Sequence, residues 1–530
     1  MADKAKFQAI KGVRDILPPE SALWNSGEQA AREVFGTFGF AEIRLPIFEQ
    51  TELFARSVGL DTDIVSKEMY TFEDHGHRDI EFARKFALNT ERYLKPGYPF
   101  GMERFLQAVD AFVDAVEGAF SGDKSLESRA NKEALLEIKQ ATSQMWPLVT
   151  PDGAVTNEDA FRSFAIRIVF RLQSFHFENL LTLRPEATAS VVRAYIEHGM
   201  QVQPGNVKLY YMGPMFRRER PQKGRYRQFY QIGAEVLGTS DAPGIDAEVI
   251  EMLMTLFERL KLKGTILNIN SIGDKNCRPA YVEKLRAELQ KVREQLGADS
   301  QRRIETNPLR VLDSKLEHEQ AIIAKLPRIG ENLCDDCRAH YAEVKRQLDL
   351  RGIRYQENWR LVRGLDYYMR TTFEITAPGL GSQNAVCGGG RYDGLVELLG
   401  GPAATKGIGF AIGTDRLILS LQEAGEGAAT GGPSGKAGGP DVYLAWFGAA
   451  AQTAAIGLAK RLRDAGFVVE LPAVEMKFGK SLGLADRLRA RHAVIVGDDE
   501  LAAGIVTVKR LSDGAQQKLA EPGLMLYLRA

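Results

Sequence analysis

The chain has 530 residues, enough for roughly three or four domains. Its 69 basic side chains are balanced by 69 acidic ones, which excludes a generally basic nucleic-acid coat but leaves room for a local basic groove. There is no apolar run of membrane-spanning length and no signal peptide, so we expect no membrane segment. Four cysteines cannot form a disulfide scaffold, and a reducing cytoplasm is the expected compartment.

The N-terminal part of the chain predicts a mixture of helix and strand. We expect a helix over residues 21–40 and a strand over residues 41–48, whose Pro46 suggests an edge or interface position. Residues 79–178 are predicted to form a helical insertion of unknown role. Apolar side chains recur there at spacings of three and four, namely Phe105, Val109, Phe112, Val116 and Phe120.

The middle of the chain is rich in strand-like sequence. Residues 207–237 carry two such runs joined by the basic loop RRERPQKGRYR, which predicts a long antiparallel hairpin. Residues 355–376 and 385–420 add further strands and a final helix, whereas residues 275–354 are mainly helical. Antiparallel strands with peripheral helices indicate an α+β domain.

A glycine-rich stretch separates a C-terminal module. Residues 424–440 contain seven glycines and almost no large side chains, so we expect a flexible linker. Residues 441–530 alternate strand-like and helical runs, which predicts a small α/β domain.

The hairpin loop carries the densest signal. Six basic side chains crowd it beside the single acid Glu219, and the aromatic rings of Tyr226 and Phe229 lie among them. We favour a phosphate or nucleic-acid contact over a solvated basic turn, because guanidiniums fork onto phosphate oxygens. Gln231 and Glu235 follow four apart, on one face of a strand, so the carboxylate needs a cationic ligand or a structural arginine. The basic residues are Arg217, Arg218, Arg220, Lys223, Arg225 and Arg227.

Four further motifs are weak when taken singly. A helix is predicted to follow LRPEAT (183–188), and Thr188 could cap its N-terminus. LVRGLDYYMRTTFE (361–374) puts Arg363 and a tyrosine pair into strand-like sequence. CGGGRYDG (387–394) favours close backbone approach and is not a P-loop. In GIGFAIGTDRL (407–417) Arg416 falls at a helix start, where a cation opposes the macrodipole and suggests an anionic ligand; a surface arginine is the alternative.

The cysteines give a weak metal signal. Cys334 and Cys337 form a C-x-x-C pair with His340 three residues on, whereas Cys277 and Cys387 are distant in sequence. A zinc site needs four ligands, or three and a water. We therefore favour ordinary helical cysteines and expect no zinc.

Together these motifs resemble the histidine–tRNA ligase family of class II aminoacyl-tRNA synthetases, over nearly the whole chain except residues 79–178. Pro46, the stretch Phe216–Glu219 and Arg416 match class II motifs 1, 2 and 3 in order. Two stretches are similar to those of the histidine enzymes in particular, LVRGLDYY (361–368) and GGGRYDGL (388–395).

The resemblance implies a class II catalytic domain formed by residues 1–78, 179–274 and 355–423, interrupted by the insertions 79–178 and 275–354 and followed by an anticodon-binding domain. It implies ATP-dependent attachment of L-histidine to tRNA(His) through histidyl-adenylate, releasing AMP and pyrophosphate, with Mg²⁺ on the outer phosphates. A cytoplasmic homodimer is expected.

The resemblance also implies a role for each site residue. Catalysis would fall to Arg217 and Arg363, which flank the α-phosphate; ATP would also meet Arg225 and Arg416. Histidine would be held by Glu186, Ala187, Thr188, Gln231, Glu235, Tyr367, Tyr368 and Tyr392, with Glu235 and Tyr368 on the imidazole. The tRNA acceptor end would meet Arg220, Gln222, Lys223 and Arg227, and the anticodon would meet the basic stretch Lys477–Arg491.

The chain departs from the family pattern in three places: Ala187 replaces the usual glycine, Asp415 replaces the usual glutamate, and residues 79–178 replace a short turn. Rival functions are a regulatory paralogue that binds histidine without charging tRNA, a class II enzyme for another amino acid, and a tRNA-binding module without catalysis. An apparent anticodon module and both histidine-specific stretches argue against the first two. A pure binder would not need Arg217, Arg363 and Arg416 around one phosphate.

Overall fold

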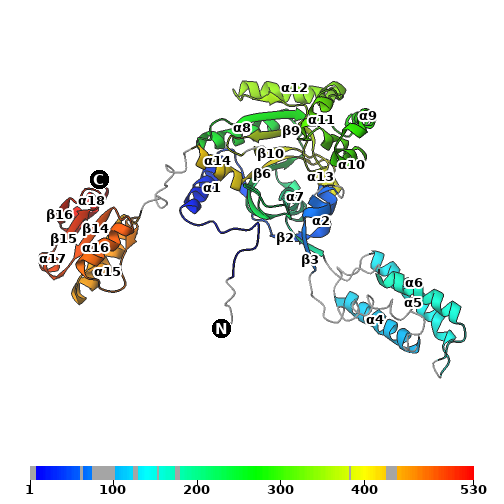
Figure 1. Ribbon diagram of the computed structural model, residues 1–530, viewed down its shortest axis with the longest axis horizontal. Coiled ribbons are helices and arrows are strands. Elements are labelled where there is room, and N and C mark those ends of the chain that lie inside the picture. Colours follow the sequence, from blue (N-terminus) through cyan, green and yellow to red (C-terminus); the bar gives the residue numbers. More distant parts are fainter. Residues whose placement is uncertain are drawn as a thin grey trace.

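The computed structural model describes residues 7–59, 62, 64–73, 102–122, 129–151, 154–173, 180–380, 384–424 and 439–529. Within them the elements pack into a large α+β body, a helical body and a C-terminal α/β body, each with its own apolar core (Figure 1). No helix in the described parts of the chain is long and apolar enough to cross a membrane.

An eight-stranded sheet forms the centre of the large body. Neighbouring strands are antiparallel except at the two ends, where β1 pairs with β5 and β7 pairs with β8 in parallel. The predicted hairpin is confirmed, since β5 and β6 pair in antiparallel register on either side of residues 217–227. In spatial order the strands are β1 (Ala41–Glu42), β5 (Val207–Phe216), β6 (Gln228–Gly238), β11 (Lys406–Gly413), β10 (Ala385–Arg391), β9 (Met369–Thr376), β7 (Ile266–Ser271) and β8 (Gln356–Glu357).

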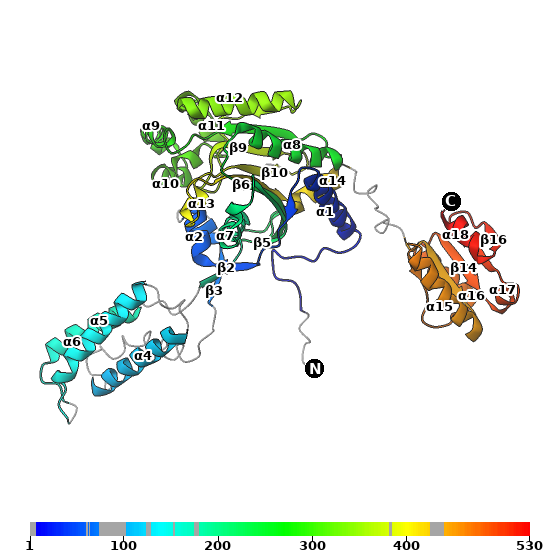
Figure 2. The same cartoon turned by 180° about the vertical axis from the view of Figure 1, so that it is seen from behind.

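Helices cover both faces of this sheet. Successive side chains of β5 point to opposite faces, so Tyr210 joins one core whereas Leu209 and Tyr211 join the other. The first core includes α1 (Glu20–Thr37), α8 (Pro243–Arg259) and α14 (Thr414–Glu423), and α12 (Asp335–Leu350) lies against α8 in both views (Figures 1 and 2). The second core includes α7 (Thr188–Glu197), the short α13 (Leu395–Leu398) and α9 (Arg278–Lys291).

The strand predicted over residues 41–48 is wrong in extent. β1 ends at Glu42, and Pro46 lies between it and β2 (Phe48–Gln50). The guanidinium of Arg184 donates to the carbonyl oxygens of Leu45 and Pro46 at 2.9 and 3.1 Å, so a side chain replaces strand pairing there. The edge position is confirmed, because β1 is the outermost strand.

A smaller sheet adjoins this region, in the order β2, β4 (Leu180–Leu183) and β3 (Tyr70–Glu73). Helix α2 (Thr51–Val58) and a π-helical turn (Ile64–Glu68) pack beside it. Because Glu73 pairs with Leu180, the long insertion leaves from the end of the β3–β4 hairpin. The backbone of the β-hairpin thus continues on either side of the inserted residues.

The described part of the predicted insertion 79–178 is helical. It consists of α4 (Met102–Gly122), α5 (Arg129–Met145), a 3₁₀ turn (Trp146–Leu148) and α6 (Glu158–Gln173). Phe105, Val109, Phe112 and Val116 are buried in its core, as their spacing predicts. The side chain of Phe120 and residues 74–101 and 174–179 lie outside the described part.

The second insertion is also helical. Between α9 and α12 come α10 (Ala298–Thr306) and α11 (Glu317–Ile323), together with 3₁₀ turns at Arg293–Gln295, Pro308–Val311 and Ile329–Asn332. Outside this insertion, a further 3₁₀ turn (Met200–Val202) follows α7. Most buried apolar side chains of this insertion belong to the same core as α7 and as Leu209 and Tyr211 of β5, whereas Val344 and Leu348 of α12 join the first core; the insertion therefore packs onto the eight-stranded sheet.

The C-terminal body has a five-stranded sheet in the order β13 (Val469–Glu470), β12 (Val442–Trp446), β14 (His492–Val496), β15 (Val506–Arg510) and β16 (Gln516–Leu519). The first three strands are parallel, and β15 and β16 add antiparallel. Its helices are α15 (Ala449–Asp464), α16 (Phe478–Arg487), α17 (Asp498–Ala502) and α18 (Glu521–Arg529). The predicted α/β organisation is confirmed; residues 425–438 of the predicted linker lie outside the described part.

Candidate active site

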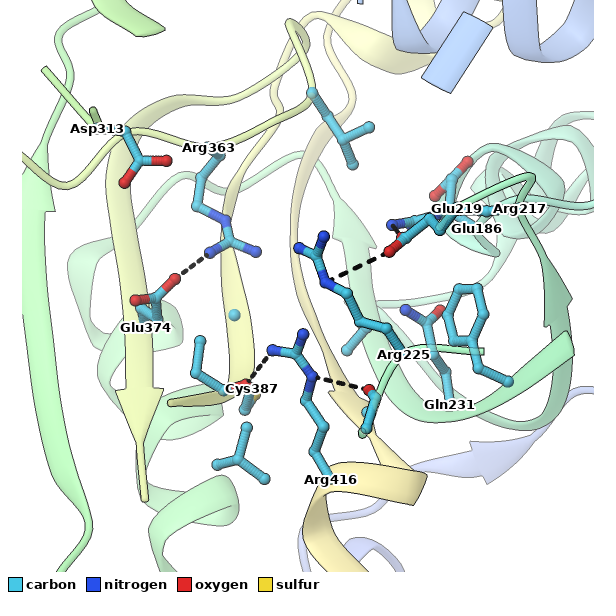
Figure 3. Close-up of a pocket in the computed structure, with 18 of the residues that line it drawn as sticks. Glu186, Arg217, Glu219, Arg225, Gln231, Asp313, Arg363, Glu374, Cys387 and Arg416 are labelled. Atoms are coloured by element: carbon cyan, nitrogen blue, oxygen red, sulfur yellow. Dashed lines mark hydrogen bonds and ion pairs between the residues drawn. The ribbon is translucent and has the colours of Figure 1, made fainter. Parts of the chain in front are cut away.

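A cavity of about 730 Å³ opens beside strands β6, β10 and β11. It gathers residues from sequence motifs far apart in the chain (Figure 3). The predicted site residues that line it are Glu186, Thr188, Arg217, Arg225, Gln231, Arg363, Tyr367, Tyr368 and Arg416. Ala187, Glu235 and Tyr392 are buried behind this lining, and the loop residues Arg220, Gln222, Lys223 and Arg227 are not part of it.

The carboxylate of Glu186 caps the N-terminus of helix α7. Its two oxygens accept hydrogen bonds from the backbone N–H groups of Thr188 and Ala189, at 2.7 and 3.0 Å. The suggestion that Thr188 caps the helix is therefore wrong: Glu186 does so, and the Thr188 hydroxyl donates to Glu235 instead. Burial raises the pKa of the Glu186 carboxyl, and the two backbone donors and the nearby Arg217 oppose that rise.

Glu235 lies at the buried end of the same cluster. Its oxygens accept hydrogen bonds from the Thr188 and Tyr392 hydroxyls, at 2.7 and 2.6 Å. Burial raises the pKa of Glu235 to about 8, aided by the charge of Glu186. Gly409 of β11 pairs with Glu235 of β6, and a Cβ at that glycine would overlap the carboxylate. The small residues of the β11 motif thus leave room for an acidic side chain.

Three tyrosines surround these carboxylates. The rings of Tyr367 and Tyr368 have centroids 4.7 Å apart, and those of Tyr367 and Tyr392 are 5.8 Å apart. The Tyr367 hydroxyl donates to Glu186 at 3.4 Å. Burial raises the pKa of Tyr368 to about 12, so its phenol keeps its proton and can donate a hydrogen bond. Carboxylates and phenols together suit a ligand that presents N–H groups.

At the other end of the cavity the charge is positive. Figure 3 shows the side chains of Arg363, Arg225 and Arg416 directed into it from different segments. Arg363 pairs with Glu374 at 3.1 Å, and its Nε is buried with no hydrogen-bond partner among the described residues. Arg217 is oriented by a bond from its Nε to the Pro185 carbonyl, 2.9 Å long. Guanidiniums collected in one cleft favour an anion that can fork onto them.

Arg416 lies in the first turn of α14, as predicted. Its guanidinium donates to the carbonyls of Ala385 and Gly224, at 2.7 and 3.3 Å. Burial lowers the pKa of Arg416, and repulsion from Arg225 adds to this, so an anion would relieve the crowding. The neighbouring Asp415 does not enter this cluster, since its oxygens accept from the Tyr230 N–H and from Arg14.

The second helical insertion contributes a wall that sequence reasoning missed. Side chains from α10 and the following turns line the cavity opposite the sheet. Arg310 and Lys315 both lie near Asp313, at 3.7 and 3.4 Å, so this wall is itself charged. No motif spacing marks these residues. Those on the wall are Asp299, Ser300, Arg303, Arg310, Asp313, Ser314, Lys315 and Leu316.

Comparison with known proteins identifies the family. Residues 158–417 match the family described as histidyl-tRNA synthetase, and residues 441–529 match the anticodon binding domain. The histidine–tRNA ligase of Koribacter versatilis (strain Ellin345) is 44% identical over 530 residues, covering 99% of this chain and 96% of that protein. This chain belongs to the histidyl-tRNA synthetase family.

Other relatives agree with this assignment. The histidine–tRNA ligase of Solibacter usitatus (strain Ellin6076) is 43% identical over 524 residues, 99% of each chain. The crystal structure of apo histidyl-tRNA synthetase from S. aureus has a TM-score of 0.66 and 30% identity, covering 99% of this chain and 100% of that one. The predicted fold, α+β with a large antiparallel sheet and a C-terminal α/β domain, is confirmed. So is the enzyme class: as a histidyl-tRNA synthetase the chain is an ATP-dependent histidine–tRNA ligase.

Proposed function

We propose that the cavity joins L-histidine to the α-phosphate of ATP, giving histidyl-adenylate and pyrophosphate, and then passes the histidyl group to tRNA(His). The observation that carries this proposal is the polarity of the cavity. One end holds buried carboxylates and phenols, and the other holds the guanidiniums of Arg363, Arg225 and Arg416. A cationic, N–H-bearing amino acid and a polyphosphate fit opposite ends of such a site.

In this proposal Glu186, Thr188 and Gln231 bind the α-ammonium group of histidine. Gln231 supports it, because its Oε1 is buried and has no hydrogen-bond partner among the described residues. An ammonium group brings three donors and no acceptor, which matches this oxygen and the Glu186 carboxylate. Ala187 acts indirectly: it is fully buried at the start of α7, and its methyl group would set the positions of Glu186 and Thr188.

The imidazole ring would be bound by Tyr368 and Glu235. Each Glu235 oxygen accepts one hydroxyl hydrogen bond, and a carboxylate oxygen can accept a second. An imidazole N–H of histidine that extends past Tyr368 would therefore donate a hydrogen bond to Glu235 as well. Tyr367 and Tyr392 would shape the pocket through their ring contacts. Such a hydrogen-bonded pocket rejects isosteres that lack the N–H groups, since its buried acceptors would stay unpaired.

ATP would occupy the cationic end. Arg217 and Arg363 would neutralise charge at the α-phosphate, while Arg225 and Arg416 would bind the rest of the triphosphate or the adenine side. Displacement at a phosphate depends mainly on positioning and on electrostatic stabilisation of the developing charge. Mg²⁺ would enter on the outer phosphates, where the nearby carboxylates Glu219 and Glu374 offer the oxygen ligands that it prefers.

The tRNA would meet two separate basic regions. Arg220, Gln222 and Lys223 are exposed on the hairpin loop and would contact the acceptor end, with the half-buried Arg227 behind them. In the C-terminal body the stretch Lys477–Arg491 would contact the anticodon. Its Phe478 is 53% exposed beside Phe447, and an exposed ring can stack on a base.

The same proposal extends to the domain boundaries, the oligomeric state and the cellular compartment of the chain. The catalytic domain would comprise residues 1–78, 179–274 and 355–423, with 441–530 as the anticodon-binding domain. A homodimer is supported by exposed apolar side chains near Pro46, namely Ile47, Phe48 and Phe72. Four free cysteines support a cytoplasmic location.

The test is amino-acid-dependent exchange of pyrophosphate into ATP, with each of the amino acids supplied separately. We expect exchange with histidine alone, and its loss in Arg363→Ala with the fold retained. Arg354→Ala, an exposed arginine outside the cavity, is the matched control and should behave as the unaltered chain. Near-normal exchange in Arg363→Ala would remove that residue from the mechanism. Histidine binding without any exchange in the unaltered chain would favour a regulatory role.

A further inference from the structure

Three of the four cysteines meet outside the active-site cavity. Cys277 and Cys334 directly precede α9 and α12, and Cys337 lies in the first turn of α12. Asp274, in the loop between β7 and α9, completes the group, and the four ligand atoms all lie within 4.8 Å of one another. The fourth cysteine, Cys387, lies on β10 and lines the cavity instead.

The sequence analysis expected no zinc because Cys277 is far from the C-x-x-C pair along the chain and His340 was the nearest further ligand. The fold removes that distance by packing α9 and α12 into one core. His340 points elsewhere: its Nε2 lies 3.2 Å from the Asp241 carbonyl and 3.7 Å from the Asp246 carboxylate. Asp274 therefore takes the place that spacing offered to His340.

The dimensions of the cluster fit a tetrahedral ion. The Oδ1 of Asp274 lies 3.6 Å from the Cys277 Sγ and 3.9 Å from the Cys334 Sγ. With Zn–S bonds of about 2.3 Å and Zn–O bonds of about 2.0 Å, tetrahedral geometry sets sulfurs about 3.7 Å apart and sulfur and oxygen about 3.5 Å apart. Small side-chain rotations would bring all four atoms to those separations.

The surroundings favour a closed cation site rather than a surface cluster. Cys337 is fully buried, and Asp274 and Cys277 are nearly so. Backbone N–H groups of Asn276 and Cys277 hold Asp274 Oδ1 in position, at 2.9 and 3.4 Å. The other oxygen, Oδ2, lies 3.5 Å from Arg370 Nη2, an outer partner that orients the carboxylate and offsets the negative charge of the ligands.

The N-termini of two helices also lie at this cluster and offset the negative charge of its ligands. Cys277 and Cys334 are the residues that precede the first turns of α9 and α12, helices of 14 and 16 residues. The N-terminal ends of both helices therefore converge on the same cluster, and each places a sulfur there. Three thiolates and one carboxylate in a four-coordinate, closed site select Zn²⁺ among the common divalent ions.

We propose that Asp274, Cys277, Cys334 and Cys337 bind a structural Zn²⁺ ion, which joins the helical insertion to the loop that follows strand β7. The ion would cross-link α12 and α9 at their N-termini. The same loop and the first residue of α9 contact the tyrosine segment of the active site, since the Arg278 side chain donates to the Tyr368 carbonyl and the Arg370 backbone N–H donates to the Gly273 carbonyl. The metal would thus brace the backbone that presents Tyr368.

The primary test is the metal content of the full-length chain, purified without chelators and measured by inductively coupled plasma mass spectrometry. We expect about one zinc per chain. Cys334→Ser, at the least buried ligand, should retain the fold and lose at least about tenfold in zinc affinity. Cys387→Ala is the matched control, because it removes a buried thiol outside the cluster and should leave the zinc content unchanged.

Two further measurements guard against a misfolded variant. Asp274→Cys should keep one zinc, since four thiolates form a complete site. Cobalt added to the metal-free chain should give the intense absorption of a tetrahedral thiolate complex, and this should be absent in Cys334→Ser. The proposal is overturned if the unaltered chain takes up neither zinc nor cobalt, or if Cys334→Ser binds zinc as tightly. A Cys334–Cys337 disulfide in chain isolated without oxygen would also overturn it and indicate a redox pair.

Discussion

The guanidinium of Arg363 lies directly against Gly388 of strand β10, where a Cβ would overlap its nitrogen atoms. This contact explains the triple glycine better than a phosphate-binding loop does. Because Gly388 has no side chain, the strand leaves room for the guanidinium of Arg363. The neighbouring Gly389 is equally restricted, as a Cβ there would meet the ring of Phe373 and the backbone of Gly409. Two motifs that are separate in sequence therefore form one structural unit.

Gly388→Ala should impair adenylate formation without unfolding the chain. The added methyl group would displace Arg363 from its position beside Glu374, and loss of one aligned charge-stabilising group costs about 10²–10³ in rate. Pyrophosphate exchange with histidine measures the effect. Gly394→Ala is the control in the same motif, since its nearest neighbouring atom is 3.9 Å from the new Cβ. Equal rates for the two variants would contradict the proposed contact.

Glu235 should make the stability of the catalytic body depend on pH. Because burial raises the pKa of this carboxyl from 4.5 to about 8, the folded chain keeps a proton that the unfolded chain releases between those values. Stability attributable to this group therefore falls as pH rises through that window. In Glu235→Gln this fall in stability should be absent. The unfolding temperature of the variant, relative to that of the unaltered chain, should therefore rise from about pH 5 to about pH 8. A difference that stays constant with pH would contradict this assignment.

A buried ion cluster between strand β10 and helix α8 should stabilise the folded chain. Arg391 is 1% exposed and bonds Asp246 and Asp393 at 2.8 and 2.7 Å. Arg391→Ala would leave two buried carboxylates without their cation, at a cost of about 3–5 kcal/mol. Calorimetry should show a lower transition temperature. Arg259→Ala, which removes an exposed pair with Glu33, is the control and should change it little.

Local patterns predicted most of the elements, whereas the expected site residues came from the resemblance to the family. The hairpin of residues 207–237, the helix that begins near Asp415 and the α/β order after residue 440 all follow from periodicity and turn residues. The motif residues meet in one cavity because antiparallel strands β6, β11 and β10 are neighbours. The pairing of Gln231 with Gly413 and of Glu235 with Gly409 is visible only in the structure, because periodicity does not show which strands are neighbours or in which register.

What sequence reasoning missed depends on contacts between distant segments. The extent of β1 was misjudged because Arg184 binds the backbone near Pro46 from another strand's end. The suggestion that Thr188 caps helix α7 is wrong because Glu186, two residues earlier, accepts the backbone N–H groups at that helix terminus. The wall formed by Asp313 and its neighbours has no spacing signal, since it depends on how the whole helical insertion packs onto the sheet.

The hairpin loop should serve tRNA charging and not amino-acid activation. Arg220 and Lys223 are exposed and lie outside the cavity lining, although Lys223 also pairs with Glu423 at 3.0 Å. The double change Arg220→Ala, Lys223→Ala should leave pyrophosphate exchange intact but raise the KM for tRNA(His) several-fold, because each lost cation removes a phosphate contact. The salt dependence of charging should become shallower in proportion.

The matched comparison for this prediction is a pair of changes at exposed cations that lie outside the loop. Lys291→Ala with Arg346→Ala, on helices α9 and α12 of the second insertion, removes the same charge and should leave the salt dependence as it was. That control separates a specific contact from a loss of general attraction between tRNA and a positive surface. If the loop variant lost exchange and charging equally, the loop would belong to the activation site. If both pairs weakened charging alike, the contact would be non-specific.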